Sequence, residues 1–565
     1  MKALLWLCFA ASSLVACGSP AKGDGAADGG PSIDAPDVCE RRCSEDLRQV
    51  LDCEGQVVET CGGTDACDAR SNVCTNACTA AEADRRSIGC DYYAVHMDTF
   101  QPKYCFAVFV ANTWNAPAKL SVTYNDSTLP IESFARLPVG SGPSLTYAAY
   151  SAADGIPPGE VAVLFLGGES GPAPRCPAPT AVPTANKIGT TLASAFHITS
   201  DVPVVAYQIN PFGGGSAGVT ASSLLLPSSA WDTKYVAVNV SPTAMGMGGG
   251  NPSLNIIARE DGTIATITPV ASIVGGGGIP PAVPGQELQL PLRKGQHAQI
   301  TQPAELTGSV ISSNKPIGFM AGQTCMTMPT GTSFCDHGEQ MLPPTRALGH
   351  SYAGVMYRPR VVNESSTFWR LVGTVDDTLL TWSTDVGGPT TLRKGQSVTF
   401  ETGKPFFVSS QDKDHPFMLF AYMTGSAYVA DGYGDPDFVL MVPPQQYLKQ
   451  YVFFTDPTYP ETNLVLVRAR GADQEFHDVT LDCLGTLGGW RPVGDFEYTR
   501  VDLVTGNFAP VGNCSTGRRE IRSDAPFGLS IWGWGTPLTT AFTGNVSYGY
   551  PGGMHVAPIN DVIIN

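Results

Sequence analysis

The chain has 565 residues, a formal net charge of −17 at pH 7 and a sequence pI near 4.9. An acidic chain lacks the basic face that displaces counterions from nucleic acid or attracts anionic lipid, so neither is expected as a partner. Only 15% of the residues are charged, while Gly (62) and Pro (45) are abundant, which favours many short strands and turns.

The first 16 residues have the layout of a secretory signal. Lys2 precedes a short apolar run that is well below the ~20 apolar residues needed to cross a bilayer. The Leu-Val-Ala before Cys17 resembles a bacterial lipobox, in which the cysteine thiol is lipidated and becomes the first mature residue. We therefore expect export and a lipid anchor on Cys17, at the outer membrane or cell surface. An ordinary signal peptide with an incidental cysteine is the alternative.

Residues 17–38 follow as a flexible tether, because a segment rich in Gly, Ala, Pro and Asp cannot bury enough apolar surface to fold. Residues 39–86 then hold seven of the sixteen cysteines. These seven are Cys39, Cys43, Cys53, Cys61, Cys67, Cys74 and Cys78. So small an exported segment needs disulfides for stability, and zinc is the alternative although the segment has no His. An odd count requires one partner outside, expected to be Cys90.

From residue 87 to residue 565 the chain repeats itself. Four segments share a polar turn, a proline and an apolar strand, and the prolines stand 113, 100 and 110 residues apart. These prolines are Pro203, Pro316, Pro416 and Pro526. A second landmark, Leu-Arg-Lys-Gly-Gln, occurs at 292–296 and again at 392–396. The period of about one hundred residues predicts four units. Their expected bounds are 87–231, 232–346, 347–446 and 447–565.

Within a unit the pattern is that of β-strands. Segments such as 253–269 and 367–383 alternate in polarity, are rich in β-branched and aromatic residues, and contain hairpin turns. No long stretch has the apolar period and caps of a helix. We predict an all-β fold in which each unit is a β-sandwich. A closed propeller-like ring is the alternative: the complementary chain ends favour closure, but the two halves of a unit differ, unlike propeller blades.

Residues 308–355 carry the most specific motif. A polar turn, an apolar strand and a cysteine are followed by Cys-Asp-His, Glu-Gln and Pro-Pro, and then by a glycine and an aromatic strand. The motif residues are Pro316, Cys325, Cys335, Asp336, His337, Glu339, Gln340, Pro343 and Pro344. This arrangement resembles the amino-terminal domain of the IgG-Fc-binding protein family, whose relatives include mucus-associated animal proteins and bacterial surface lipoproteins. The resemblance implies a binding or adhesive surface domain, identifies no ligand, and weakens at Gly338–Pro344 and in the fourth unit, which lacks the Pro-Pro.

The other cysteines are expected to form disulfides within their units, leaving residues 39–86 and Cys90 as a closed set of eight. The expected pairs are Cys105–Cys176, Cys325–Cys335 and Cys483–Cys514.

Two clusters could bind a metal ion. Asp336, His337 and Glu339 lie within four residues, but a strand would point them in alternating directions, so a structural role is expected. Asp431–Asp437 could gather oxygen ligands around Ca²⁺, but it lacks the required spacing and a turn is expected. Catalytic signatures such as G-x-S-x-G, H-E-x-x-H and a Walker lysine are missing from the sequence. We expect no catalytic residue, cofactor or metal.

The sequence as a whole predicts a non-enzymatic envelope lipoprotein that presents a repeated β scaffold to an extracellular glycan or protein. Aromatic residues near loops, such as Trp114 and Trp534, suit stacking on sugars, although most aromatic side chains belong to a core. A secreted polysaccharide hydrolase would need two converging carboxylates, one with a raised pKa, and is one alternative. A purely architectural envelope protein is the other.

Overall fold

The computed structural model describes residues 41–169, 175–242, 250–539 and 541–564. The expected signal peptide, the lipidated Cys17 and the tether lie outside these residues. Within them the fold is all-β, as predicted, with forty strands and two short helices, α1 (Ala77–Asp84) and α2 (Ile131–Phe134). No helix in this part of the chain is long and apolar enough to cross a membrane.

Residues 41–86 form a small module held by disulfide bonds. Its strands are β1 (Arg42–Cys43), β2 (Gln49–Leu51), β3 (Val57–Thr60), β4 (Asp65–Asp68) and β5 (Val73–Asn76). Disulfides join Cys43 to Cys67 and Cys61 to Cys74. The buried apolar cluster of β1–β5 is very small, so these bridges supply stability that a core of this size does not.

The module is also tied to the first repeat unit. Cys78, in α1, forms a disulfide with Cys90, the outside partner expected from the odd count. The helix begins at Asn76, whose side chain accepts hydrogen bonds from two backbone N–H groups of the first turn. Cys53 is disulfide-bonded as well, and Cys39 lies outside the described residues.

Each repeat unit folds into two facing layers of strands, and in the first, second and fourth units one long strand takes part in both layers. In the second unit this strand is β21 (Val310–Met326). Its first half pairs with β16 (Asp232–Val236) and β18 (Thr263–Thr268), and its second half pairs with β17 (Pro252–Ala258) and β22 (Asp336–Met341). Apolar side chains of both sheets meet in one buried cluster, so the unit is the predicted two-sheet sandwich.

The other units repeat this plan, with β14, the pair β29 and β30, or β39 in the place of β21. The first sandwich contains β6 (Gly89–Ala94), β7 (Phe106–Asn112), β8 (Leu120–Tyr124), β9 (Ser127–Thr128), β10 (Ala135–Val139), β11 (Thr146–Ala149), β12 (Val161–Gly167), β14 (Phe196–Ile209) and β15 (Ser222–Leu225). The second also contains β13 (Thr191–Ser194), β19 (Leu288–Leu292) and β20 (Gln296–Thr301).

The third and fourth sandwiches complete the set of strands. The third contains β23 (Ser351–Gly354), β24 (Thr367–Gly373), β25 (Thr378–Leu379), β26 (Thr381–Trp382), β27 (Thr391–Leu392), β28 (Ser397–Thr402), β29 (Phe406–Ser409), β30 (Phe417–Met423) and β31 (Asp437–Leu440). The fourth contains β32 (Leu448–Thr455), β33 (Glu461–Arg468), β34 (Val479–Leu481), β35 (Gly485–Thr486), β36 (Arg491–Val493), β37 (Phe496–Thr505), β38 (Ala509–Pro510), β39 (Gly517–Trp534) and β40 (Ser547–Pro551).

The repeated prolines stand where the long strands pass from one sheet to the other. Three of them lie inside β14, β21 and β39, and the fourth lies between β29 and β30. The pairing register of β14, β21 and β39 shifts in this region. Because proline has no N–H to give to a sheet, it suits a position where a strand leaves one set of partners.

A buried tyrosine, in β6, β16, β23 or β32, contacts this crossing in each sandwich. Its hydroxyl group donates a hydrogen bond to the carbonyl oxygen of the residue that follows the proline. The four pairs are Tyr92 with Val204, Tyr235 with Ile317, Tyr352 with Phe417 and Tyr451 with Phe527. We call this contact the tyrosine latch. It recurs in every sandwich, so it belongs to the plan of the repeat.

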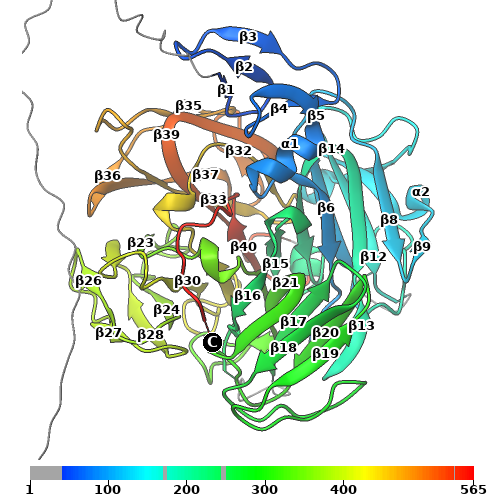
Figure 1. Ribbon diagram of the computed structural model, residues 1–565, viewed down its shortest axis with the longest axis vertical. Helices are drawn as coiled ribbons and strands as arrows, with labels where there is room; N and C mark the ends of the chain where they lie inside the picture. Colours follow the sequence, from blue (N-terminus) through cyan, green and yellow to red (C-terminus); the bar gives the residue numbers. More distant parts are fainter. Residues whose placement is uncertain (1–40, 170–174, 243–249, 540, 565) are drawn as a thin grey trace, which may run out of the picture. The chain divides into compact units, whose positions relative to one another are not determined.

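The four sandwiches close into a ring around their last strands. These central strands are β15, β22, β31 and β40; β15 lies beside β22 and β40, and β31 also lies beside β22 and β40. Figure 1 shows the differently coloured sandwiches around a centre that holds β15 and β40. Apolar clusters also run across the interfaces between sandwiches. The units are therefore sandwiches, and their closed arrangement is the feature that the propeller-like alternative had anticipated.

After β40 the chain returns to the start of the ring. The backbone N–H of Ser87 donates to the carbonyl oxygen of Met554 at 2.9 Å, and the Asn560 side chain donates to the carbonyl oxygen of Thr345 at 2.9 Å. One strand departs from the expected units: β13 lies in the segment 87–231 but pairs with β20 of the second sandwich.

Candidate binding groove

The family-motif residues of β22 lie at the centre of the ring. Asp336, His337 and Glu339 are fully buried. The Gln340 side chain donates to the carbonyl oxygens of Ser222, at 2.9 Å, and of Gly549, at 3.1 Å. The motif therefore joins three of the central strands and is not exposed to a ligand.

Among the candidate metal ligands of the motif, strand alternation separates Asp336 from His337 and Glu339, which lie close to each other. Asp336 accepts a hydrogen bond from the backbone N–H of Ser547, in the fourth sandwich, at 3.3 Å. Glu339 accepts one from the Gln208 side chain of the first sandwich at 2.7 Å, and His337 lies 3.5 Å from Glu339. Among the described residues, no three His, Cys, Asp or Glu side chains are grouped as a metal site.

Motif positions outside β22 are structural too. Pro343 and Pro344 are buried and precede the short helix η4 (Thr345–Ala347), while Pro316 lies at the sheet crossing of β21. The structure joins the three cysteine pairs expected in the repeat region. These disulfides are Cys105–Cys176, Cys325–Cys335 and Cys483–Cys514.

The candidate Ca²⁺ turn is committed to protein contacts. Asp431 accepts a hydrogen bond from the Asn545 side chain at 2.9 Å, and Asp435 accepts one from the backbone N–H of Ser426 at 3.0 Å. Burial raises the pKa of Asp435 to about 7, although the Ser426 N–H and the nearby Arg360 oppose the rise. Burial also raises the pKa of Asp437 well above its usual range. Of these carboxylates, Asp431 contacts the fourth sandwich through Asn545, and Asp435 contacts Ser426 of its own unit.

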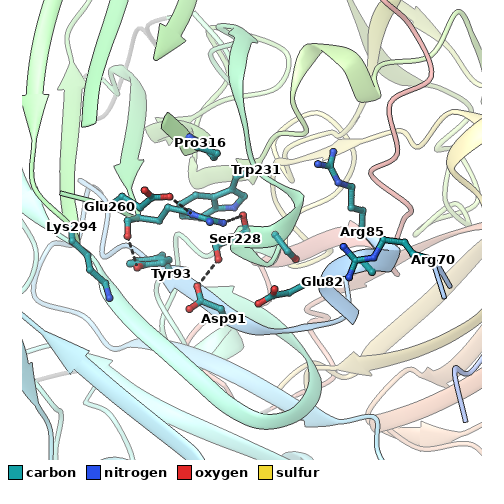
Figure 2. A pocket seen from close by; sticks show the side chains of 13 residues that line it. Arg70, Glu82, Arg85, Asp91, Tyr93, Ser228, Trp231, Glu260, Lys294 and Pro316 are labelled. Carbon is teal, nitrogen blue, oxygen red and sulfur yellow. Dashed lines mark hydrogen bonds and ion pairs between the residues drawn. The ribbon is translucent and has the colours of Figure 1, made fainter. Parts of the chain in front are cut away.

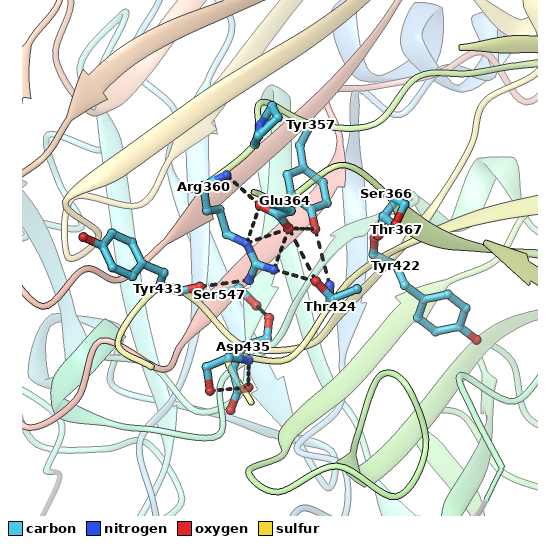
Figure 3. A network of polar contacts seen from close by, with 12 residues as sticks. Tyr357, Arg360, Glu364, Ser366, Thr367, Tyr422, Thr424, Tyr433, Asp435 and Ser547 are labelled. Atoms are coloured by element: carbon cyan, nitrogen blue, oxygen red, sulfur yellow. Dashed lines mark hydrogen bonds and ion pairs between the residues drawn. The ribbon is translucent and has the colours of Figure 1, made fainter. Parts of the chain in front are cut away.

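A buried ion pair lies beside this turn, where the third and fourth sandwiches meet (Figure 3). The guanidinium of Arg360 donates to the Glu364 carboxylate at 2.7 Å and to the carbonyl oxygen of Tyr433 at 2.9 Å. Tyr357 and Thr424 complete its surroundings, since the Tyr357 hydroxyl donates to Glu364 at 2.8 Å and Arg360 donates to Thr424 at 2.6 Å. The side chains of Arg360 and Glu364 are 0% and 1% exposed, so this network is also part of the interior.

The surface feature best suited to a ligand is a pair of adjoining cavities between the disulfide module and the first two sandwiches. Their volumes are about 740 Å³ and about 260 Å³, and Tyr93 and Lys294 line both. We call the two cavities together the groove. Asp91 and Tyr93 come from β6, Ser228 comes from the short helix η3 (Ser228–Ala230), and Lys294 comes from the turn between β19 and β20.

The floor of the groove is built from side chains that hold one another. The Asp91 carboxylate accepts a hydrogen bond from the Ser228 hydroxyl at 2.6 Å and lies 2.8 Å from Nε2 of His197. Burial alone would raise the pKa of Asp91, but the contacts with His197 and Ser228 outweigh it and hold that pKa below its usual value. Figure 2 shows Asp91, Ser228 and Tyr93 between Lys294 on one side and Arg85 on the other.

The order of these groups does not match a serine hydrolase. A catalytic relay places the histidine between the serine and the carboxylate, so that the imidazole takes the proton of the hydroxyl. Here Asp91 lies between Ser228 and His197, and the serine hydroxyl donates to the carboxylate. This arrangement positions side chains and does not activate a nucleophile.

The aromatic rings near the groove are covered. The ring of Tyr93 stacks on His197 at 4.4 Å and contacts Trp231 at 5.3 Å, leaving Tyr93 only 1% exposed. Trp114 and Trp534, which the sequence suggested for sugar stacking, are 5% and 0% exposed and belong to the core. These residues therefore have no exposed ring face on which a sugar could stack.

Three cations on the rim of the groove have no side-chain partner among the described residues. They are Arg85, Arg293 and Lys294. Arg293 and Lys294 belong to the repeated Leu-Arg-Lys-Gly-Gln, which occurs in the same form at 392–396. No sequence signal separates the two copies, and only the fold brings the first copy to the groove.

Comparisons with known proteins agree with the motif. The sequence model of the family described as "IgGFc binding protein" matches residues 221–533, more than half of the chain. A human protein named IgGFc-binding protein is 24% identical over 300 residues, which are 52% of this chain and 5% of that protein. The chain thus spans about a twentieth of the length of this relative. No solved structure gave a significant match.

Proposed function

The chain belongs to the IgGFc binding protein family, and from this premise we propose that it is a non-enzymatic cell-envelope protein that binds an extracellular macromolecule. The groove is the observation that carries this proposal. It has a pre-formed floor, a volume of about 740 Å³ in its larger part and a rim of uncommitted charged side chains. Such pre-formed concave sites with a few placed polar groups are typical of binding sites.

The proposal includes an anchor on Cys17. The Leu-Val-Ala-Cys at the end of the apolar leader supports it, and the tether that follows would hold the ring away from the membrane. Metabolic labelling with a fatty acid tests it, because Cys17→Ala should abolish the label and release the protein from the membrane fraction. Label retained by Cys17→Ala would contradict the anchor and would leave the proposal about the groove unchanged.

The groove does not favour the rival hydrolase. An acid catalyst of glycoside hydrolysis needs a carboxyl group with a raised pKa beside a second carboxylate. Asp91 has a lowered pKa, and Glu260, another carboxylate of the larger cavity, is paired with Arg259 at 3.3 Å and with Lys315 at 3.7 Å. The carboxyls of the ring centre whose pKa values burial raises, such as Asp336, Glu339 and Asp437, do not line the groove.

A pull-down with the full-length, oxidised protein against envelope and matrix extracts tests the proposal. We expect saturable capture of one glycan or protein fraction, lost after substitutions on the groove. Turnover of a polysaccharide would replace the proposal with the hydrolase. Absence of any saturable interaction would favour an architectural role.

A further inference from the structure

We propose that the groove takes an acidic polysaccharide, a polymer of hydroxyl-bearing sugars that carry carboxylate or sulfate groups. This inference rests on the proposed function, since it names the ligand class of the same groove. It depends on three observations: the charges that remain uncommitted, the polar groups that line the groove, and the lack of an open apolar anchor.

Lys294 stands where the two cavities of the groove adjoin, because it lines both. Arg85 lines the larger cavity and Arg293 the smaller one. Their side chains have no hydrogen-bond or ion-pair partner in the described ranges, whereas Arg259 donates to the carbonyl oxygen of Ser228 and pairs with Glu260. A chain of net charge −17 thus keeps three cations unpaired along one groove. Such a row suits a ligand with repeated negative charges.

The carboxylates Asp91 and Glu260 in the groove already have protein partners. Asp91 is held by His197 and Ser228, and Glu260 by Arg259 and Lys315. The side chains of Glu82, in the larger cavity, and Asp126, in the smaller one, have no hydrogen-bond or ion-pair partner in the described ranges, although Glu82 acts electrostatically on Arg70. The three cations therefore outnumber these two carboxylates, and the Asp261 carboxylate beside Lys294 accepts a hydrogen bond from the backbone N–H of that residue.

The lining favours a sugar polymer over a protein partner. The energetic centre of a protein interface is an apolar or aromatic anchor in a dry pocket. Here Tyr93 and Trp231 are 1% and 4% exposed and have no open face to offer. The groove is lined instead by residues with hydroxyl and amide side chains, Thr123 and Asn125 among them.

The repeat provides a matched control for this inference. In both copies of Leu-Arg-Lys-Gly-Gln the arginine N–H donates to the glutamine side chain, at 2.8 Å in Arg293 and 2.9 Å in Arg393. The lysine N–H donates to an aspartate, at 3.0 Å in Lys294 and 3.1 Å in Lys394. The two turns share their backbone contacts, and only the first lines the groove. Reversing the charges in either turn makes the same chemical change at two places.

The test compares binding of the full-length wild type, R293E/K294E and R393E/K394E to three immobilised polymers. Polygalacturonate carries carboxylates, heparin carries sulfates, and dextran is neutral. We expect saturable binding of the wild type to at least one acidic polymer and none to dextran, with affinity falling as salt rises from about 50 to about 300 mM. R293E/K294E should weaken this binding by about tenfold or more, and R393E/K394E by less than about twofold. Thermal melting checks that both variants are folded.

The outcomes separate this inference from the proposed function. Equal losses of affinity in the two variants would mean that the acidic polymers bind the protein surface non-specifically. Unchanged binding in R293E/K294E would mean that the groove is not the binding site. Either result overturns the inference. Binding to an extract fraction with no affinity for the acidic polymers would also overturn it, while leaving the proposed function in place. Failure of every binding assay would remove both.

Discussion

The hydroxyl group of Tyr235 donates a hydrogen bond to the carbonyl oxygen of Ile317, 2.7 Å away, where the long strand β21 changes sheets. The same hydroxyl accepts a hydrogen bond from the backbone N–H of Asp232 at 3.2 Å. Tyr235 therefore bonds to backbone groups of both β16 and β21 where the long strand changes sheets. The tyrosine latch recurs in all four sandwiches, so its removal from any of them should lower the free energy of unfolding.

Tyr235→Phe should lower the free energy of unfolding by about 1–3 kcal/mol, because it leaves the buried carbonyl of Ile317 without its donor. Denaturant unfolding of the variant measures this loss. Tyr428→Phe is the control, since the Tyr428 hydroxyl donates to Glu401 at 2.8 Å on the exposed surface. Removal of that hydroxyl should change nothing measurable, and an equal loss in both variants would argue against the latch.

Glu364→Gln should destabilise the protein by about 3–5 kcal/mol, because it leaves the buried guanidinium of Arg360 without its counter-charge. The double variant R360M/E364M should lose less than the single one, since it removes both charges together. Asp561→Asn, which breaks the exposed pair with Lys413, serves as the control and should have no measurable effect. A double variant less stable than Glu364→Gln would contradict this account.

The contribution of Asp435 to stability should fall as the pH rises from about 4 to about 7, against the opposite contribution of His96, His297 and His337, whose pKa values burial lowers to about 3. Burial raises the folded-state pKa of Asp435 to about 7, from an ordinary value of 3.8. At Asp435 the folded state in this range binds more protons than the unfolded state, so each rise in pH weakens the stability that this group contributes. Asp336 and Asp437, whose pKa values burial also raises, act in the same direction.

Asp435→Asn should remove this contribution, so the free energy of unfolding of the wild type minus that of the variant should fall with pH, as measured by denaturant unfolding at a series of pH values. The exposed Asp377→Asn provides a comparison variant that should keep the pH dependence of the wild type. A difference between wild type and Asp435→Asn that rises between these pH values would show that Asp435 is ionised in the folded protein.

Removal of the Cys105–Cys176 bridge should cost more stability than removal of Cys325–Cys335. The two bridges close loops with sequence separations of 71 and 10 residues. The chain entropy that they remove from the unfolded state corresponds to about 4 and about 3 kcal/mol. Paired Cys→Ala variants compared in thermal and denaturant unfolding test this order, and the reverse order would point to effects in the folded state.

Local patterns were sufficient to predict the fold class and the sandwich units. Alternating polarity sets which residues of a strand face the core, and it correctly separated Asp336 from His337 and Glu339. The prolines predicted a repeated feature, and the structure identifies it as the crossing between sheets. These are short-range properties, readable within one unit.

Properties that depend on ring closure could not be read in this way. Gln340 meets Gly549 across more than two hundred residues, and β13 leaves its expected unit to pair with β20. Lys294 and Lys394 stand in identical sequence motifs, yet only Lys294 reaches the groove. Long-range packing decided these positions, and a single sequence carries no local sign of it.

The burial of the β22 motif at the ring centre separates the residues that define the family from the residues that would determine ligand specificity. A chain can be recognised as a family member from side chains that no ligand touches, since Asp336, His337, Glu339 and Gln340 bind only other parts of the same chain. The rim of the groove includes positions that precede the matched segment, such as Arg85. Relatives that keep the same buried β22 motif can therefore differ in the ligand that they bind.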